Sequence, residues 1–362
     1  MASEQDLVVE TVRDILAGHE PFALTADTAW DAALWADLAE AGLTGVGLPE
    51  EAGGSGGELA DAVAVVRTLA AGAGAVPVAE QLLAAGPALL AADLDLPDPA
   101  EPLTLAVAGT VTAEPVDDGD GPGRWRLTGT ATDVAWAGVA RHVAVLAQPP
   151  EGIEGAVLAL VDAEGLATSD ARNLVGEPRG SLVLGGTAAS GALLTPAQAG
   201  EVRARYALAR AVQLAAALEQ VLAWTVQYAG ERHQFGRPLG RFQAVQMELA
   251  EMAGEVTAVT ALVDAAVQTL DGATAPPTRD VVLAAAAAKV RAGAAVEVVA
   301  RLAHQVHGAI GFTQEYRLHH LTRRLWSWRD EAGSELTWSQ VLGVGLLAQG
   351  GDGLWPALTR VV

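Results

Sequence analysis

The strongest constraint on the fold is the order in which the character of the sequence changes along the chain. Residues 1–103 and 198–362 show apolar residues at helical spacing, whereas residues 104–197 gain Val, Thr and Gly and lose charged helix formers. The order helix, strand, helix is uncommon. We therefore predict an α+β multi-domain protein: an N-terminal helical domain over 1–103, a middle β-barrel or sheet domain over 104–197, and a C-terminal four-helix bundle over 198–362.

The N-terminal domain contains two clear helical patterns. The run DAALWADLAEA at 31–41 repeats Leu34 and Leu38 on one face, and Gly42 is suited to end the helix. A second helix is expected from Glu58 to about Ala71.

The middle domain shows short apolar runs between clusters of Gly, Pro and Asp, which is typical of an antiparallel sheet or small barrel. The runs are Arg124–Gly129, His142–Ala147, Ala156–Val161 and Ser181–Leu184. The segment VDDGDGPG at 116–123 predicts a turn or mobile loop. The C-terminal domain predicts long helices with short links, which favours a bundle. They cover Glu201–Ala229, Arg241 to about Leu270, and Thr278–Val306.

Composition excludes several classes of protein. The hydrophobic fraction is 51%, which excludes a disordered chain. With 44 acidic and 22 basic residues the formal charge is -22, so we expect neither nucleic acid nor an anionic membrane as a partner. Cysteine is absent, which removes disulfides, thiolate metal ligands and cysteine nucleophiles. We expect no metal site, no secretory signal and a cytoplasmic location.

Two segments of the C-terminal domain carry chemistry. The first, RHQFGRPL at 232–239 followed by Phe242-Gln243, combines an arginine fork suited to pyrophosphate with a glycine turn before a helix start. The second, HQVHGAIGFTQEY at 304–316, places a glycine-rich turn after a helix. Taken singly, each segment also fits an ordinary interhelical loop or a helix C-cap.

Together these segments resemble the R-x-x-F-G…Q and Q-x-x-G-G-x-G-F-x-x-E-Y/H signatures of the acyl-CoA dehydrogenase family, in the same order. LAEAGLTGVGLPEEAGG at 38–54 resembles the family's N-terminal opening. The resemblance implies dehydrogenation of an acyl-CoA thioester with FAD bound mainly by a neighbouring subunit. It implies flavin contacts from Arg232, Gln234, Phe235, Gly236, Gln243, Gln305, Gly308, Gly311 and Phe312.

The middle domain departs from the family pattern. Family members carry E-P-x-A-G-S-D beside the flavin, and residues 103–115 (LTLAVAGTVTAEP) have no such run. A later family segment, N-G-x-K-x-W-I-T, places a Trp and a Thr at the isoalloxazine ring. Here residues 127–135 keep the L-x-G-T start and lose the Lys, Trp and final Thr, while Trp136 is out of step. We therefore expect this chain to be poorly equipped to hold a flavin ring of its own.

The catalytic base is the second departure, because removing a proton α to a thioester carbonyl calls for a Glu of raised pKa. One family position for the base falls near Tyr206, among arginines. The other matches Glu331 in DEAGSE only if one upstream residue is deleted. Without a gap, residues 318–324 followed by Gly333 resemble a branch without a base there, whose heteromeric members act on sterol side chains and similar bulky thioesters.

Three hypotheses follow from these patterns. The first is a partner subunit that completes the flavin site of a second acyl-CoA dehydrogenase-like subunit in a hetero-oligomer, with an electron-transferring flavoprotein as acceptor. The second is a self-sufficient enzyme, as a homo-oligomer, with Glu331 as base. The third is a structural subunit without flavin contact. The missing middle-domain segments oppose the second hypothesis, and the intact C-terminal motifs oppose the third.

Overall fold

The computed structural model describes residues 4–20, 30–116, 123–271 and 278–348, together with 350 and 352. They form two compact units: residues 1–66 with 74–209, and residues 67–73 with 210–362. Most of the loop predicted at 116–123 lies outside the described residues. The division into three domains at 103/104 and 197/198 remains a proposal.

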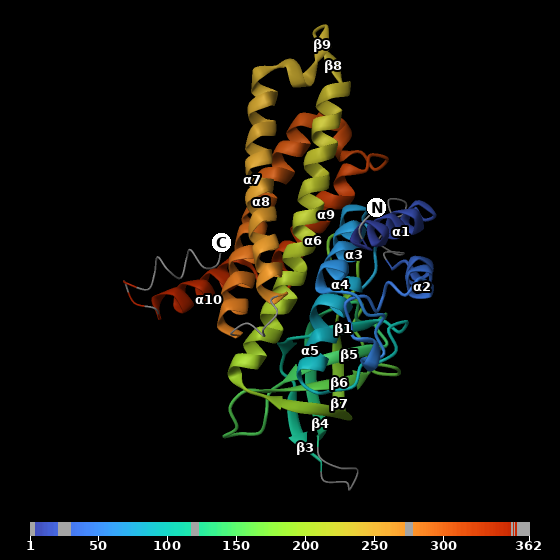
Figure 1. The fold of residues 1–362 in the computed structure, drawn as a ribbon, viewed down its shortest axis with the longest axis vertical. Coiled ribbons are helices and arrows are strands. Elements are labelled where there is room, and N and C mark those ends of the chain that lie inside the picture. The colour runs from blue at the N-terminus through green and yellow to red at the C-terminus, as the bar shows by residue number, and fades with distance from the viewer. Residues whose placement is uncertain are drawn as a thin grey trace. The chain divides into compact units, whose positions relative to one another are not determined.

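The first unit begins with helices (Figure 1). They are α1 (Glu4–Ala17), α2 (Ala32–Glu40), η2 (Glu50–Ala52), α3 (Leu59–Ala71), α4 (Val78–Glu80), η3 (Gln81–Ala85) and α5 (Gly86–Ala91). Both helices expected in this region are confirmed, and α2 starts where the Leu34 N–H donates to the Asp31 side chain at 2.9 Å. Gln81, in a π-helical turn, donates to the Thr44 and Pro99 carbonyls and accepts from the Leu103 N–H. One buried amide thus joins these helices to the first strand.

The same unit continues into a seven-stranded sheet of order β1-β5-β6-β7-β4-β2, with β3 paired to β4. The strands are β1 (Leu103–Ala106), β2 (Ala108–Gly109), β3 (Thr112–Pro115), β4 (Arg124–Ala135), β5 (His142–Ala147), β6 (Ala156–Asp162) and β7 (Arg179–Leu194). All four predicted strand runs lie in it. The expectation of antiparallel pairing holds except at β1 and β5, which are parallel.

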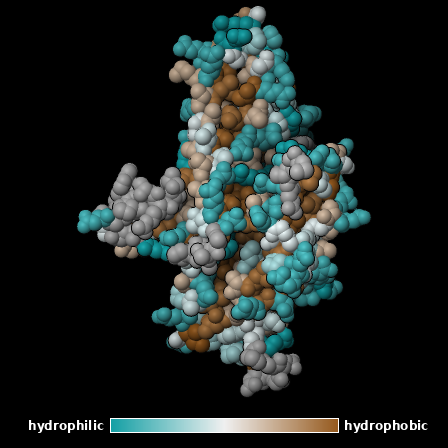
Figure 2. Space-filling view, in the orientation of Figure 1, coloured by the Kyte–Doolittle hydropathy of each residue, from teal (hydrophilic) through white to brown (hydrophobic). Residues whose placement is uncertain are grey.

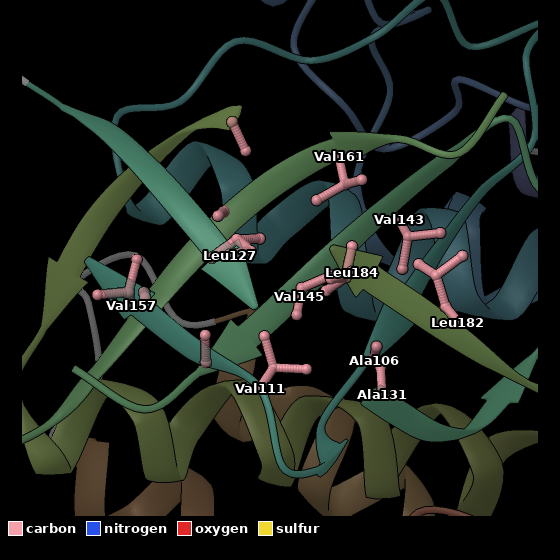
Figure 3. Packing of buried hydrophobic residues seen from close by; sticks show 14 of the residues in the cluster. Ala106, Val111, Leu127, Ala131, Val143, Val145, Val157, Val161, Leu182 and Leu184 are labelled. Atoms are coloured by element: carbon pink, nitrogen blue, oxygen red, sulfur yellow. The ribbon is translucent and has the colours of Figure 1, made fainter. Parts of the chain in front are cut away.

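Alternating residues of these strands form the core of the sheet (Figure 3). Leu127, Val143, Val157 and Leu182 are each at most 2% exposed. Because successive strand residues face opposite sides, this buried set fixes the register of the strands.

The second unit is helical (Figure 1). Its elements, counting α6 as the helix that enters it, are α6 (Pro196–Glu231), β8 (His233–Gln234), β9 (Arg237–Pro238), η4 (Leu239–Arg241), α7 (Gln243–Leu270), α8 (Thr278–His307), η5 (Gly308–Phe312), α9 (Leu318–Asp330) and α10 (Glu335–Leu347). The three long helices expected from the sequence are confirmed, with bounds that differ by a few residues at each end. The α-helical bundle is built on small residues of α8, since Ala284, Ala288, Ala292 and Ala295 are at most 2% exposed.

Candidate functional site

The first sequence motif forms a hairpin between α6 and α7 (Figure 1). Strands β8 and β9 pair through His233–Gln234 and Arg237–Pro238. At the tip Phe235 has φ 51° and Gly236 has φ 80°, the left-handed pair that a tight two-residue hairpin turn requires. Phe235 is 93% exposed.

Three polar side chains at this hairpin carry the family-type flavin contacts. Arg232, Gln234 and Gln243 are exposed, and within the described ranges none of their side chains makes a hydrogen bond or ion pair. The backbone around Arg232 is fixed: its N–H donates to the Tyr228 carbonyl at 2.9 Å, and its carbonyl accepts from the Leu239 N–H at 2.8 Å. An unpaired guanidinium on a fixed backbone is suited to a phosphate group brought by another molecule.

The second motif forms the turn η5 at the end of α8. Gly308 has φ 64°, a conformation that side chains disfavour. A Cβ at Gly311 would lie 3.1 Å from both His304 Nδ1 and His307 Cβ. Both glycines are therefore needed for the turn to fold back on α8. Phe312, 72% exposed, stacks on His304 with ring centroids 4.4 Å apart.

Three histidines of this region have a lowered pKa, which favours their neutral form. Burial lowers the pKa of His304 and of His307. Burial, with His319 and two arginines nearby, lowers the pKa of His320 to about 4. His307, only 3% exposed, lies 2.7 Å through Nδ1 from the Ala303 carbonyl, which assigns the proton to Nδ1. Gln305, which directly follows His304 on α8, is exposed.

The end of β4, where family members support the flavin ring, is buried in this chain. Ala135 is fully buried, and Trp136, with φ 61°, is 3% exposed. The Trp136 Nε1–H donates to Oε1 of fully buried Glu80 on α4 at 2.9 Å. Trp136 also meets Trp30 edge to face at 6.1 Å. Trp136, the aromatic residue nearest in sequence to the family's flavin-contacting tryptophan, therefore lies in the protein interior.

A fit to FAD therefore differs between the two parts of the chain. The hairpin and the η5 turn offer an unpaired arginine, exposed amides and close backbone approach, which fit the pyrophosphate and adenosine end. The end of β4 offers a buried alanine and an inward tryptophan, which do not fit the isoalloxazine ring. No hydroxyl replaces the family threonine at Ala135.

Glu331, the proposed base, follows the last residue of α9. Its Oε2 lies 2.9 Å from Nε of Arg210 on α6, and the side chains are 15% and 1% exposed. An ion pair with a buried cation stabilises the charged carboxylate and makes it a weaker proton acceptor. Tyr206, at the other family position, is 4% exposed and offers no carboxylate.

A buried lysine supports the same end of α9. Lys289 donates to the Trp328 and Arg329 carbonyls at 3.2 and 2.5 Å, and burial lowers the pKa of Lys289 to about 8. The side chains of Arg329 and Glu335 form an ion pair at 2.5 Å. These hydrogen bonds and this ion pair hold the end of α9 and the start of α10 in place on either side of Glu331.

Two further properties bear on function. In the part of the chain that the structure describes, no helix is long and apolar enough to cross a membrane. Over those same residues, no three His, Asp or Glu side chains come together as a metal site.

Comparison with known proteins identifies the class. The acyl-CoA dehydrogenase N-terminal domain model matches residues 2–92, and the acyl-CoA dehydrogenase C-terminal domain model matches residues 202–335. This chain belongs to the acyl-CoA dehydrogenase family, whose members are FAD-dependent oxidoreductases.

One related sequence and two solved structures resemble this chain over most of its length. The acyl-CoA dehydrogenase IpdE2 of Mycobacterium tuberculosis is 31% identical over 87% of this chain and 89% of its own length. A variant of the Tcur3481-Tcur3483 steroid ACAD matches with a TM-score of 0.81 and 27% identity over 96% of this chain and 99% of that one. The ChsE4-ChsE5 complex from Mycobacterium tuberculosis matches with a TM-score of 0.81 and 26% identity, over 96% and 98%.

Some interactions at the site were not foreseen from the sequence. These are the Arg210–Glu331 ion pair, the Glu80–Trp136 hydrogen bond, and the packing of Tyr228 on His307. Each joins residues far apart in the chain, and no local pattern marks them.

Proposed function

We propose that this chain is the partner subunit of a heteromeric, FAD-dependent acyl-CoA dehydrogenase. In this assembly it completes the flavin site of a second acyl-CoA dehydrogenase-like subunit and supplies no base. Arg232 holds the pyrophosphate, while Gln243 and the Gln305–Phe312 turn contact the rest of the adenosine end. FAD, when bound, supplies the acceptor for the hydride that leaves the acyl chain.

The observation that carries the proposal is the contrast between the two parts of the chain. The Trp136 Nε1–H donates to buried Glu80, and Ala135 stands where the family has a threonine, so neither position can support the flavin ring. Arg232 and Gln243 nevertheless keep exposed side chains that make no hydrogen bond or ion pair within the described residues. Residues that retain one half of a cofactor site and lack the other fit a shared site better than a complete one.

The surface of the helical unit supports association with another chain. Figure 2 shows apolar residues between polar ones over the long helices. Large apolar side chains that are at least half exposed include Val226, Met247, Leu336, Val344 and Leu347. Exposed large apolar side chains on α6, α7 and α10 favour an interface with another chain.

The names of similar proteins support a substrate class. Because one related structure is described as a steroid ACAD, we propose a bulky acyl-CoA thioester, such as a steroid side chain, as the substrate. An electron-transferring flavoprotein is the proposed acceptor. We also keep the cytoplasmic location as part of the proposal. The alternative, a self-sufficient homo-oligomer with Glu331 as base, rests on the match of DEAGSE to a family base position after one upstream residue is deleted.

Flavin stoichiometry tests the proposal. The chain is purified alone, and again after co-expression with the acyl-CoA dehydrogenase-like product of a neighbouring gene. We expect the chain alone to be colourless or poorly loaded, and the complex to be yellow with less than one FAD per chain. A yellow homo-oligomer carrying one FAD per chain would overturn the partner-subunit assignment. A flavin-loaded complex whose FAD retention is unaffected by Arg232→Ala would do so as well.

A further inference from the structure

Two aromatic side chains connect the flavin motifs of this chain to each other. Tyr228 lies on α6 one turn before Arg232, and its carbonyl accepts the Arg232 N–H. The Tyr228 ring stacks on His307, the last residue of α8, with centroids 4.4 Å apart and planes 21° apart. The Tyr228 hydroxyl donates to the His307 carbonyl at 3.3 Å. His307 directly precedes Gly308, where the η5 turn begins.

The His307 ring is held rigidly enough to act as an anchor. It is 3% exposed, and its Nδ1–H donates to the Ala303 carbonyl, so its tautomer and orientation are fixed. Tyr316 packs against both rings, at 5.2 Å from His307 and 6.3 Å from Tyr228. In this aromatic trio His307 is buried and both tyrosines are half-buried, and the ring contacts tie the end of α8 to α6.

A second contact joins the same elements beyond the turn. The Arg317 guanidinium lies 4.3 Å from the Trp224 ring centroid on α6, and it also donates to the Gln227 side chain at 3.3 Å. The η5 turn is therefore tied to α6 on both sides, at His307 before it and at Arg317 after it.

We infer that Tyr228 and His307 are positioning residues that set the spacing between Arg232 and the Gln305–Phe312 turn, so that both engage one FAD molecule. The inference rests on the proposed function. The pair itself contacts no ligand: its rings are packed against each other and against Tyr316. The pair sets this spacing through the backbone. The Arg232 N–H donates to the Tyr228 carbonyl, and the η5 turn directly follows His307 in the chain.

The test uses the flavin-loaded complex with Tyr228→Met, which keeps apolar bulk and removes the ring, and with Tyr228→Phe, which keeps the ring. Loss of the ring stack should weaken FAD binding about two- to twelvefold, equivalent to about 0.5–1.5 kcal/mol for an aromatic pair. Tyr228→Phe should restore affinity to within about twofold. The dissociation constant is measured by flavin fluorescence on titration with FAD.

Val263→Ala provides the matched control, because Val263 is fully buried in α7 and far along that helix from Gln243. It should lower the melting temperature without changing FAD affinity. Amide hydrogen exchange of the uncomplexed chain supplies a readout independent of flavin. Tyr228→Met should speed exchange at Thr313, whose N–H donates to the Ile310 carbonyl across the turn, and Val263→Ala should not.

Combining variants separates the possible failures. If Tyr228 acts through the placement of Arg232, the effect of Tyr228→Met should be smaller in an Arg232→Ala background. Equal effects in the two backgrounds would sink the positioning role and leave the proposed function standing. If Arg232→Ala alone leaves FAD affinity unchanged, the proposed flavin contact itself is wrong. A Tyr228→Met complex with unchanged FAD affinity and unchanged exchange at Thr313 also overturns the inference.

Discussion

Replacing Glu331 by Gln separates a structural carboxylate from a catalytic one. Glu331 lies 2.9 Å from Arg210, which is 1% exposed and also donates to the Gln213 side-chain oxygen at 2.5 Å. Gln keeps the shape and one acceptor oxygen but removes the negative charge. Buried Arg210 would then lose the negative charge that Glu331 places beside it.

The magnitude follows from this geometry. Breaking a buried ion pair by removing one partner costs about 3–5 kcal/mol. In Glu331→Gln the new side chain can still accept a hydrogen bond, and the Glu331 side chain is 15% exposed. We therefore expect the free energy of unfolding to fall by less, about 2 kcal/mol, which is the lower range for a hydrogen bond to a charged group. For a cooperative unit of this size the melting temperature should fall by about 4–8 °C.

The assay scores stability and catalysis separately. Thermal unfolding is followed by circular dichroism, and turnover and flavin bleaching by acyl-CoA are measured per folded complex. We expect a lower melting temperature with turnover almost unchanged. Replacing both partners, Arg210→Met with Glu331→Met, should recover most of the lost stability, since an apolar pair often substitutes for a buried ion pair without loss.

Glu335→Gln is the matched control, because Glu335 pairs with Arg329 at 2.5 Å in a more exposed setting, with side chains 19% and 26% exposed. It should lower stability less than Glu331→Gln does. The reasoning is refuted by a Glu331→Gln complex that melts like the wild type but loses turnover about 10²–10⁴-fold, the usual contribution of a positioned general base. That result would make Glu331 the base and this chain a catalytic subunit.

Three further outcomes are expected. Arg232→Ala should weaken FAD retention in the complex by about tenfold or more, since a hydrogen bond to a charged group contributes about 1.5–3 kcal/mol, and fluorescence of released flavin after dilution measures it. Because burial holds the pKa of His320 in the folded chain at about 4, below its unfolded value of 6.5, the unfolded state takes up the proton first. The stability that neutral His320 contributes is therefore present above pH 6.5 and lost as the pH falls toward 4. The melting temperatures of the wild type and of His320→Asn, measured across that pH window, should converge at low pH. Trp136→Phe removes the donor to buried Glu80 and should destabilise the first unit by about 1–3 kcal/mol in urea unfolding, without lowering FAD content of the complex.

The sequence alone determined the order of the elements and most of their bounds. Helical periodicity located α6, α7 and α8, and runs of apolar residues between turn residues located four strands, because these signals are local. It also determined the two turns, since positive φ at Gly236 and Gly308 depends on the residue type at those positions. The parallel pairing of β1 with β5 was not predicted, because strand direction depends on a long connection rather than on composition.

The tertiary structure decided which partners the polar and aromatic side chains have, and therefore which of them are available to a ligand. The sequence offered Glu331 as a base, and only the fold brought Arg210 against it. Trp136 looked like a displaced ring contact, and only the fold showed it bonded to Glu80, 56 residues earlier in the chain. Tyr228 and His307 meet across 79 residues. The protonation, orientation and accessibility of a side chain depend on the groups packed around it, and those groups come from distant segments that local sequence patterns do not specify.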